Sequence, residues 1–291
     1  MRDGLIYVHL MVLRTKPRSF ALVLLILAFR VAAAERDPAF SPIQVTLVPG
    51  QDALVPGETF TLGIHQRMLL GYHTYWKNPG TLGMALSMKW QLPEGFVASP
   101  IRWPVPMVTR MASYDVWGYE GEALLLVDLK VPGNLRTGQE VSLKGLATWM
   151  CCSDQCYPEA RELALTLPVR DRASPDEKWS QRLERVREQQ PEKPPGWKVT
   201  CAEVGETFRL QLAWRGDGKR PQTGRIHFFG DDRQVSSSKP QVVVMDGDRV
   251  DLVLPMEEHA PESLSRLKGI LVAEHSWGGG VEVLKVDVAL E

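Results

Sequence analysis

Short runs in which apolar and polar residues alternate follow one another along the chain from residue 43 to residue 169. Because the side chains of a β-strand point alternately to its two faces, this pattern predicts half-buried strands. The clearest runs are residues 44–48, 59–64, 123–129 and 163–167. Turn-forming Pro-Gly pairs separate such runs, for example at 49–50, 56–57 and 132–133. Strands at this spacing favour an antiparallel β-sandwich, because a parallel sheet needs longer helical crossovers.

A helical pattern replaces the strand pattern in residues 173–196. Ser174 is suited to cap the helix, Pro175 to occupy its first position, and Glu177 to close a capping box. An apolar stripe then repeats at helical spacing on an otherwise charged segment, at Trp179, Leu183 and Val186. Pro191 ends this helix, and the stiff polar run that it opens predicts a linker.

Strand patterns return in the last third of the chain, at residues 208–212, 225–229, 241–244, 250–254 and 281–286. We therefore expect a mostly β protein with two sandwich-like domains. The first covers residues 35–172, the helix and linker cover 173–196, and a second, smaller β domain covers 197–291.

The first 34 residues have the layout of an export signal. A basic region with Arg14, Lys16 and Arg18 precedes an apolar run of ten residues at 20–29, and three alanines end at Ala34. The apolar run is too short to cross a bilayer, which takes about 20 residues. We expect cleavage near Ala34 and a soluble protein in the periplasm or outside the cell.

Composition excludes several classes of protein. With 44% hydrophobic residues, 24% charged residues and nine tryptophans among 291 residues, the chain is neither disordered nor of low complexity. The formal net charge is −1, and residues 1–34 hold five basic residues and one acidic residue. Their removal leaves a mildly acidic chain without the basic field that nucleic-acid binding needs.

The cysteines are the most informative feature of the sequence. Three of the four, Cys151, Cys152 and Cys156, fall within six residues. A bridge from Cys152 to Cys156 closes only a short loop and adds little stability. A short-range pair does suit reversible exchange, because the second thiol is held close enough to resolve a mixed disulfide formed by the first.

The residues leave three interpretations of this cluster open. Cys152 and Cys156 can form a reversible redox pair, which needs no organic cofactor. Alternatively, Cys151, Cys152 and Cys156 can bind a soft metal, since clustered thiolates suit Cu(I) or Zn(II). A third interpretation is an inert structural disulfide beside buried free cysteines. Cys201 is expected to be such a buried free cysteine, acting as a small hydrophobic residue. Five methionines could add thioether ligands for Cu(I), although methionine is also a common core residue: Met84, Met88, Met107, Met111 and Met150.

Five segments, in order, resemble a known family. They are GYHTYWKNPG (71–80), WQLPEGF (90–96), IRWPVP (101–106), YDVWGYEGEALLLV (114–127) and WMCCSDQCYP (149–158). The family is the N-terminal periplasmic domain of the thiol:disulfide interchange protein DsbD, and the likeness is greatest to its version in the copper-sensitivity suppressor ScsB. RIHFFGDDRQV (225–235) and LSRLKGILV (264–272) resemble the second part of the ScsB-type region more weakly.

The resemblance implies an immunoglobulin-like sandwich that works as a component of a protein-disulfide reductase. Its active cysteines fall on Cys152 and Cys156, and Cys151 stands where the family has an apolar residue. Such a domain takes electrons from a membrane partner and passes them to oxidised periplasmic thioredoxin-like proteins. Cys156 then forms the mixed disulfide and Cys152 resolves it. Since this sequence ends at Glu291 without the family's membrane carrier, we expect another chain to supply the electrons.

The resemblance also implies a loop that covers the disulfide, at residues 114–120. Val116, Trp117 and Tyr119 are the predicted shielding residues, although Trp117 and Tyr119 are equally suited to plain core packing. Asp115 and Glu120 are the candidates for tuning the thiols, because a nearby carboxylate raises the pKa of a thiol. A copper-binding or protein-interaction module with a structural disulfide remains the alternative function.

Overall fold

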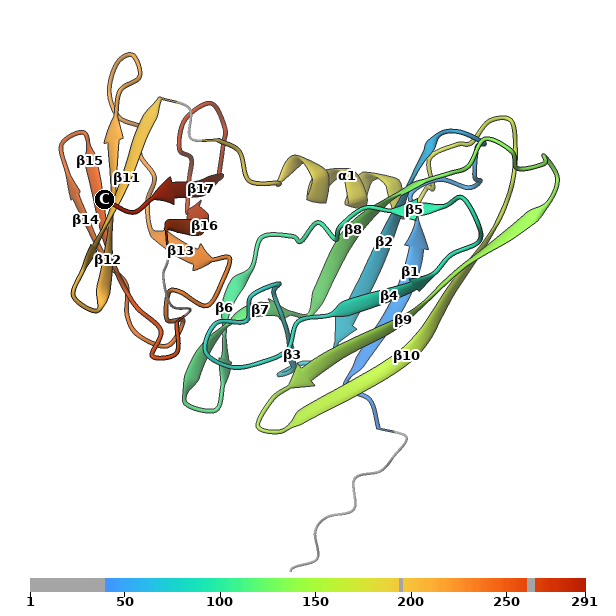
Figure 1. The fold of residues 1–291 in the computed structure, drawn as a ribbon, viewed down its shortest axis with the longest axis horizontal. Coiled ribbons are helices and arrows are strands. Elements are labelled where there is room, and N and C mark those ends of the chain that lie inside the picture. The colour runs from blue at the N-terminus through green and yellow to red at the C-terminus, as the bar shows by residue number, and fades with distance from the viewer. Residues whose placement is uncertain (1–39, 194–195, 261–264) are drawn as a thin grey trace, which may run out of the picture. The chain divides into compact units, whose positions relative to one another are not determined.

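The computed structural model describes residues 40–193, 196–260 and 265–291 (Figure 1). Residues 41–291 form one compact unit. The predicted export signal, residues 1–34, lies outside the described residues. In the described ranges, no helix is both long and apolar enough to cross a membrane.

Two antiparallel sheets make up the part of the chain that precedes the helix. The first has the strand order β1-β2-β8-β5, and the second has the order β10-β9-β3-β7-β6, with β4 paired to β9. The strands are β1 (Ile43–Pro49), β2 (Thr59–Met68), β3 (His73–Tyr75), β4 (Ser87–Gln91), β5 (Val97–Ala98), β6 (Met107–Met111), β7 (Tyr114–Glu120), β8 (Glu122–Lys130), β9 (Glu140–Cys152) and β10 (Cys156–Pro168). The mostly β, antiparallel fold class predicted from the sequence is confirmed.

Strand β8 has an almost continuous apolar sequence because both of its faces are buried. Leu125 and Val127 point into the main core between the sheets, whereas Leu124 and Leu126 lie in a separate cluster on the other face. Both faces of this strand are therefore covered, because helix α1 (Ser180–Glu188) packs on the outer one.

Helix α1 confirms the predicted stripe but not the predicted start. Trp179, Leu183 and Val186 are buried together against the sheet. The helix begins at Ser180 with Trp179 as its cap residue, so the predicted cap at Ser174 is wrong. The amide of Ser174 donates to Asp52 at 2.7 Å instead, and the Asp176 carboxylate receives the Trp179 amide at 2.8 Å. These contacts place residues 174–179 in a connecting segment and a turn that precede the helix.

Polar contacts also fix the C-terminal end of helix α1 to the sheet. Arg187 donates to the Asp128 carboxylate at 3.0 Å and to the Thr61 hydroxyl at 2.9 Å, and Arg102 pairs with Asp128 at 2.7 Å. Burial acts to raise the pKa of Asp128, but the hydrogen bond and the charge of Arg187 outweigh it and hold that pKa below its usual value. Asp128 therefore stays ionised as the acceptor for both guanidinium groups.

Two further antiparallel sheets follow in residues 197–291, which we call the C-terminal part. Their strand orders are β11-β12-β15-β14 and β13-β16-β17. The strands are β11 (Trp197–Val204), β12 (Thr207–Trp214), β13 (Ile226–Gly230), β14 (Val242–Asp246), β15 (Arg249–Pro255), β16 (Arg266–Ala273) and β17 (Val283–Ala289). The main core includes residues of both parts, among them Trp117 and Phe229. The division into domains at 172 and 197 stays a prediction.

Leu183 is the residue through which α1 covers the sheet, so we expect Leu183→Ala to lower the free energy of unfolding by about 2–5 kcal/mol. Leu183 is 2% exposed, and its two methyl groups lie over the glycine backbone at Gly63 and Gly50. Denaturant unfolding of both variants measures the effect, with the exposed Arg185→Ala on the same helix as control, expected to change stability by less than about 0.5 kcal/mol. Equal losses in the two variants would contradict this packing.

Candidate redox site around the Cys152–Cys156 disulfide

The hairpin of β9 and β10 brings the two cysteines together. Figure 1 shows these strands as a long antiparallel pair, and their register places Cys152 directly opposite Cys156 at the end where the chain turns. Residues directly opposite each other in such a ladder carry side chains on the same face. The two residues form a disulfide, with Cα atoms 4.2 Å apart. The local bridge expected from the sequence is therefore present.

Cys151 lies on the other face of β9, because neighbouring side chains in a strand point in opposite directions. It is a free, buried thiol in the main core. Burial, with a smaller contribution from Glu159, raises the pKa of this thiol to about 12. In the parts of the chain that the structure describes, no group of three or more His, Cys, Asp or Glu residues is placed to hold a metal ion. The three-cysteine metal site considered for Cys151, Cys152 and Cys156 is thus not assembled.

Cys201, on β11, is the second free cysteine. It is buried in the main core, and burial together with the charge of Glu291 raises its pKa to about 12. Its environment is that of a small hydrophobic core residue, as the sequence suggested.

A row of four side chains crosses the sheet at the disulfide. Cys156 on β10 faces Cys152 on β9, Cys152 faces His73 on β3, and His73 faces Glu120 on β7. Burial lowers the pKa of His73, which favours the neutral imidazole. Glu120 is exposed at the outer end of the row, with His73 between it and the cysteines.

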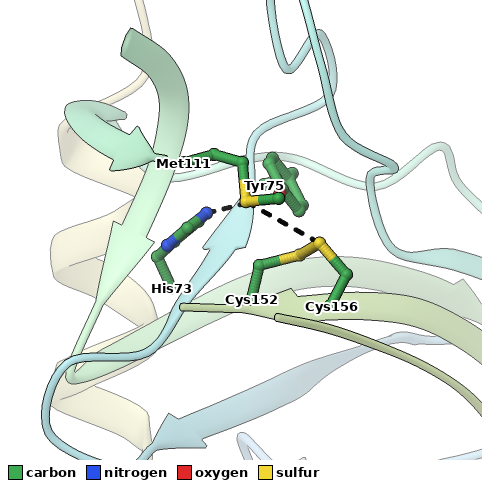
Figure 2. Close-up of a disulfide and its surroundings, with 5 residues drawn as sticks. All are labelled: His73, Tyr75, Met111, Cys152 and Cys156. Carbon is green, nitrogen blue, oxygen red and sulfur yellow. Dashed lines mark hydrogen bonds between the residues drawn. A yellow bond between two sulfur atoms is a disulfide. The ribbon is translucent and has the colours of Figure 1, made fainter. Parts of the chain in front are cut away.

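Tyr75 stands two residues after His73 on the same face of β3. Its hydroxyl lies 3.3 Å from His73 Nε2, and Figure 2 shows its ring beside the disulfide. Tyr75 packs in one buried cluster with Val116 and Cys152. Burial, followed by the nearby Cys151, raises the pKa of Tyr75 to about 12, so that the hydroxyl keeps its proton at neutral pH.

The two sulfurs of the disulfide differ in accessibility. Cys152 is 0% exposed, whereas Cys156 is only partly buried. The thioether of Met111 lies 3.8 Å from Cys156 Sγ, as Figure 2 shows. A disulfide sulfur carries no proton, so this is a sulfur–sulfur contact in the oxidised protein and becomes a weak hydrogen bond only after reduction. Met111 belongs to the hairpin of β6 and β7, which therefore covers the reachable sulfur.

The predicted shielding residues lie on two faces of β7. Val116 packs with Cys152 and Tyr75, whereas Trp117 and Tyr119 belong to the main core. Strand alternation explains this division, because Val116 shares the face of Glu120 and of the cysteine row. The Tyr119 hydroxyl donates to the backbone carbonyl of Pro104 at 2.8 Å. Of the three residues, Val116 is the one in contact with the disulfide cluster.

The Asp115 carboxylate, a predicted tuning group, lies 3.4 Å from the guanidinium of Arg110 on β6. Asp115 directly precedes Val116 in the hairpin of β6 and β7, opposite Arg110. It does not belong to the row formed by Cys156, Cys152, His73 and Glu120. Its backbone carbonyl accepts hydrogen bonds from the C-terminal part, as described below.

Comparison with known proteins identifies the region that carries this site. Residues 44–168 match the family described as thiol:disulfide interchange protein DsbD, N-terminal. This part of the chain is therefore similar to the N-terminal domain of that family. The crystal structure of the N-terminal periplasmic domain of ScsB from Proteus mirabilis matches with a TM-score of 0.62 at 16% identity, over 87% of this chain and 95% of that one. The immunoglobulin-like fold expected of a DsbD N-terminal domain is therefore present.

Other solved structures are much less similar. A family 123 glycoside hydrolase from Clostridium perfringens has a TM-score of 0.25 at 10% identity, over 46% of this chain and 28% of that one. A protein of unknown function from Porphyromonas gingivalis W83 has a TM-score of 0.24 at 10% identity, over 86% of this chain and all of that one. No curated protein matches the sequence.

Three residues around the disulfide were not predicted as part of the site: His73, Tyr75 and Met111. A signal for the first two was present, because they stand two residues apart in GYHTYWKNPG and a strand places such residues on one face. Met111 precedes a two-residue turn in which Ala112 has a φ of 52°. Its position over Cys156 depends on the pairing of β6 with β7 and was not readable from spacing.

The two free thiols should be inert in the folded protein. With pKa values of about 12, Cys151 and Cys201 are ionised in only about one molecule in ten thousand at pH 8. We expect iodoacetamide at pH 8 to leave both unlabelled in native protein and to label both in guanidinium, as peptide mass spectrometry would detect. Labelling of native Cys151 at the denatured rate would contradict the assigned burial.

Proposed function

We propose that this protein is an exported thiol–disulfide exchange protein that relays electrons through Cys152 and Cys156. The observation that supports this most strongly is the disulfide itself, which joins a buried sulfur to a partly exposed one at the end of a hairpin. A bridge across so short a loop contributes little to stability. Its placement beneath a single covering hairpin suits exchange with another protein.

The reaction begins at the partly exposed sulfur. A partner thiolate attacks Cys156 Sγ, the bond between Cys152 and Cys156 breaks, and a mixed disulfide forms between the partner and Cys156. Cys152 leaves with the electron pair as a thiolate and takes up a proton. A second partner thiolate then attacks the mixed disulfide and releases Cys156, so the partner is oxidised by two electrons and this protein is reduced. The reverse sequence reduces an oxidised downstream protein.

The leaving group is the difficult part of this step. The Cys152 thiolate forms at a site that is 0% exposed and lined by Val116, where an unpaired charge is costly. Tyr75, in the same cluster, is a protonated hydroxyl at neutral pH and can donate to it. His73 Nε2, 3.3 Å from the Tyr75 hydroxyl, holds that hydroxyl in place. Tyr75 is therefore the group that we assign to stabilising the leaving thiolate.

The proposed partners follow from the family. The electron donor is a membrane reductase of the DsbD or ScsB type, and the acceptors are oxidised periplasmic thiol proteins of the thioredoxin-like class. The predicted export signal is consistent with a periplasmic location, where disulfides form and persist.

Trapping the mixed disulfide tests which sulfur is attacked. In Cys152→Ser, the remaining Cys156 thiol should form a glutathione adduct with oxidised glutathione at least about tenfold faster than the Cys152 thiol does in Cys156→Ser, because exchange depends on access to the sulfur. Intact-mass spectrometry follows both reactions. In the Cys152→Ser adduct, a partner thiol should displace glutathione from Cys156.

A matched control for this trapping is Cys151→Ser, which should keep the native disulfide and form no adduct. Equal rates in the two single variants, or an adduct on Cys151, would contradict the assignment of Cys156 as the attacked sulfur.

Tyr75→Phe tests the leaving-group role, because it keeps the ring and removes only the hydroxyl. A hydrogen bond to a charged group is worth about 1.5–3 kcal/mol, so we expect reduction by dithiothreitol at pH 7 to slow at least about tenfold. Tyr114→Phe, at the exposed first position of β7, is the control and should react as wild type does. A wild-type rate for Tyr75→Phe would rule out this role.

A further inference from the structure

Strand β7 connects the disulfide to the C-terminal part. One of its residues, Val116, packs against Cys152. A tight turn joins the start of β7 to the preceding strand β6, and the last residue of β6, Met111, lies against Cys156 Sγ. Whatever holds β7 in place therefore determines how the two sulfurs are covered.

The C-terminal part supplies hydrogen bonds to β7 where its neighbouring strand stops. The short strand β3 pairs only with residues 118–120 of β7, so the backbone carbonyl of Asp115 lies beyond that ladder. The Ser237 hydroxyl donates to this carbonyl at 2.7 Å and the Ser238 hydroxyl donates to it at 3.1 Å. Two serines thus take the place of a strand partner one residue before Val116.

Ser237 is fully engaged in this contact. It is 6% exposed, and its oxygen also accepts the backbone amide of Thr81 at 3.0 Å. Gly80 stands so close to Ser237 that a Cβ on Gly80 would collide with its hydroxyl. The serine therefore ties β7 to the turn that contains Gly80, and that turn is itself held by Asn78, which donates to the Gly230 carbonyl at 2.8 Å.

The residue on the other side of Val116 is held by aromatic contacts. Trp117 is 0% exposed, and its ring lies 5.6 Å from the ring of Phe229 and 6.4 Å from that of Trp76. Its backbone amide donates to the Pro79 carbonyl at 2.9 Å. Val116 is therefore flanked by two residues that the C-terminal part and the adjoining turn fix in position.

We propose that the C-terminal part acts as a clamp on β7, with Ser237, Ser238 and Phe229 as positioning residues for the exchange at Cys156. A thiolate needs room beside Cys156 Sγ, where the Met111 thioether now lies. The hairpin of β6 and β7 must move aside before attack, and the clamp sets how often it does so. This inference rests on the proposed exchange function for its biological meaning.

A clamp of this kind has a kinetic signature. Opening precedes attack in both directions, so a weaker clamp raises the rate of reduction and the rate of reoxidation by the same factor. The reduction potential depends on the free-energy difference between the closed oxidised and the closed reduced protein. A weaker clamp therefore leaves the potential unchanged. A residue that acts on the thiols themselves would shift the potential.

The test uses the full chain with Ser237→Ala and Ser238→Ala combined. Loss of a net hydrogen bond worth about 1 kcal/mol should raise the reduction rate with dithiothreitol about fivefold, and reoxidation by oxidised glutathione by the same factor. Ser142→Ala is the control, because it removes a hydroxyl that bonds Thr166 at the other end of the same sheet. It should leave both rates as in wild type.

Rates within about twofold of wild type in the double variant would overturn the clamp, whatever the change in melting temperature. A shift in potential, with only one rate altered, would overturn it as well. Should the double variant not fold, Phe229→Leu, which keeps an apolar side chain and removes the ring contact with Trp117, decides by the same two rates. The trapping experiment on Cys156 stands apart: its failure would remove the exchange function, whereas unchanged rates here remove only the clamp.

Discussion

The antiparallel register of β9 with β10 is the constraint on which the site depends. It places Cys152 opposite Cys156 and, through β3, sets His73 in the same row. A shift of one residue would turn Cys152 to the core face and bring Cys151 to the site. The thirteen-residue length of both strands and the apolar inner face of β9 make such a shift costly. Selection of the disulfide-bonded pair among three neighbouring cysteines is thus a consequence of strand pairing.

Unequal burial then divides the roles of the two bonded sulfurs. The partly exposed Cys156 can be reached once the Met111 thioether moves, whereas Cys152 stays beneath Val116 and beside Tyr75. In the proposed exchange, the attacked sulfur is therefore the more accessible one, and the negative charge develops on the buried sulfur, in one cluster with the Tyr75 side chain. Strand β7 contributes to both, since it carries Val116 and leads into the hairpin that holds Met111.

Local patterns predicted most of the strands, because alternation records which face is buried. The helix start could not be predicted, since the Ser174 and Asp176 contacts with residues near Gly50 come from a segment far away in the sequence. The cysteine pair followed from its spacing and from the family resemblance. Met111 did not, because it is 45 residues from Cys156 and meets it only through the pairing of β6 with β7. The separation of Val116 from Trp117 needed the orientation of β7 as well as its sequence.

The reduction potential of the Cys152–Cys156 pair tests the central claim most directly. It is measured on the full chain in glutathione and dithiothreitol buffers, with acid quenching, alkylation and mass spectrometry of all four cysteines. Exchange through this pair requires a potential of about −200 to −250 mV localised to Cys152 and Cys156. A potential below about −300 mV, or a bridge that includes Cys151 or Cys201, would mean a structural disulfide and would contradict the account.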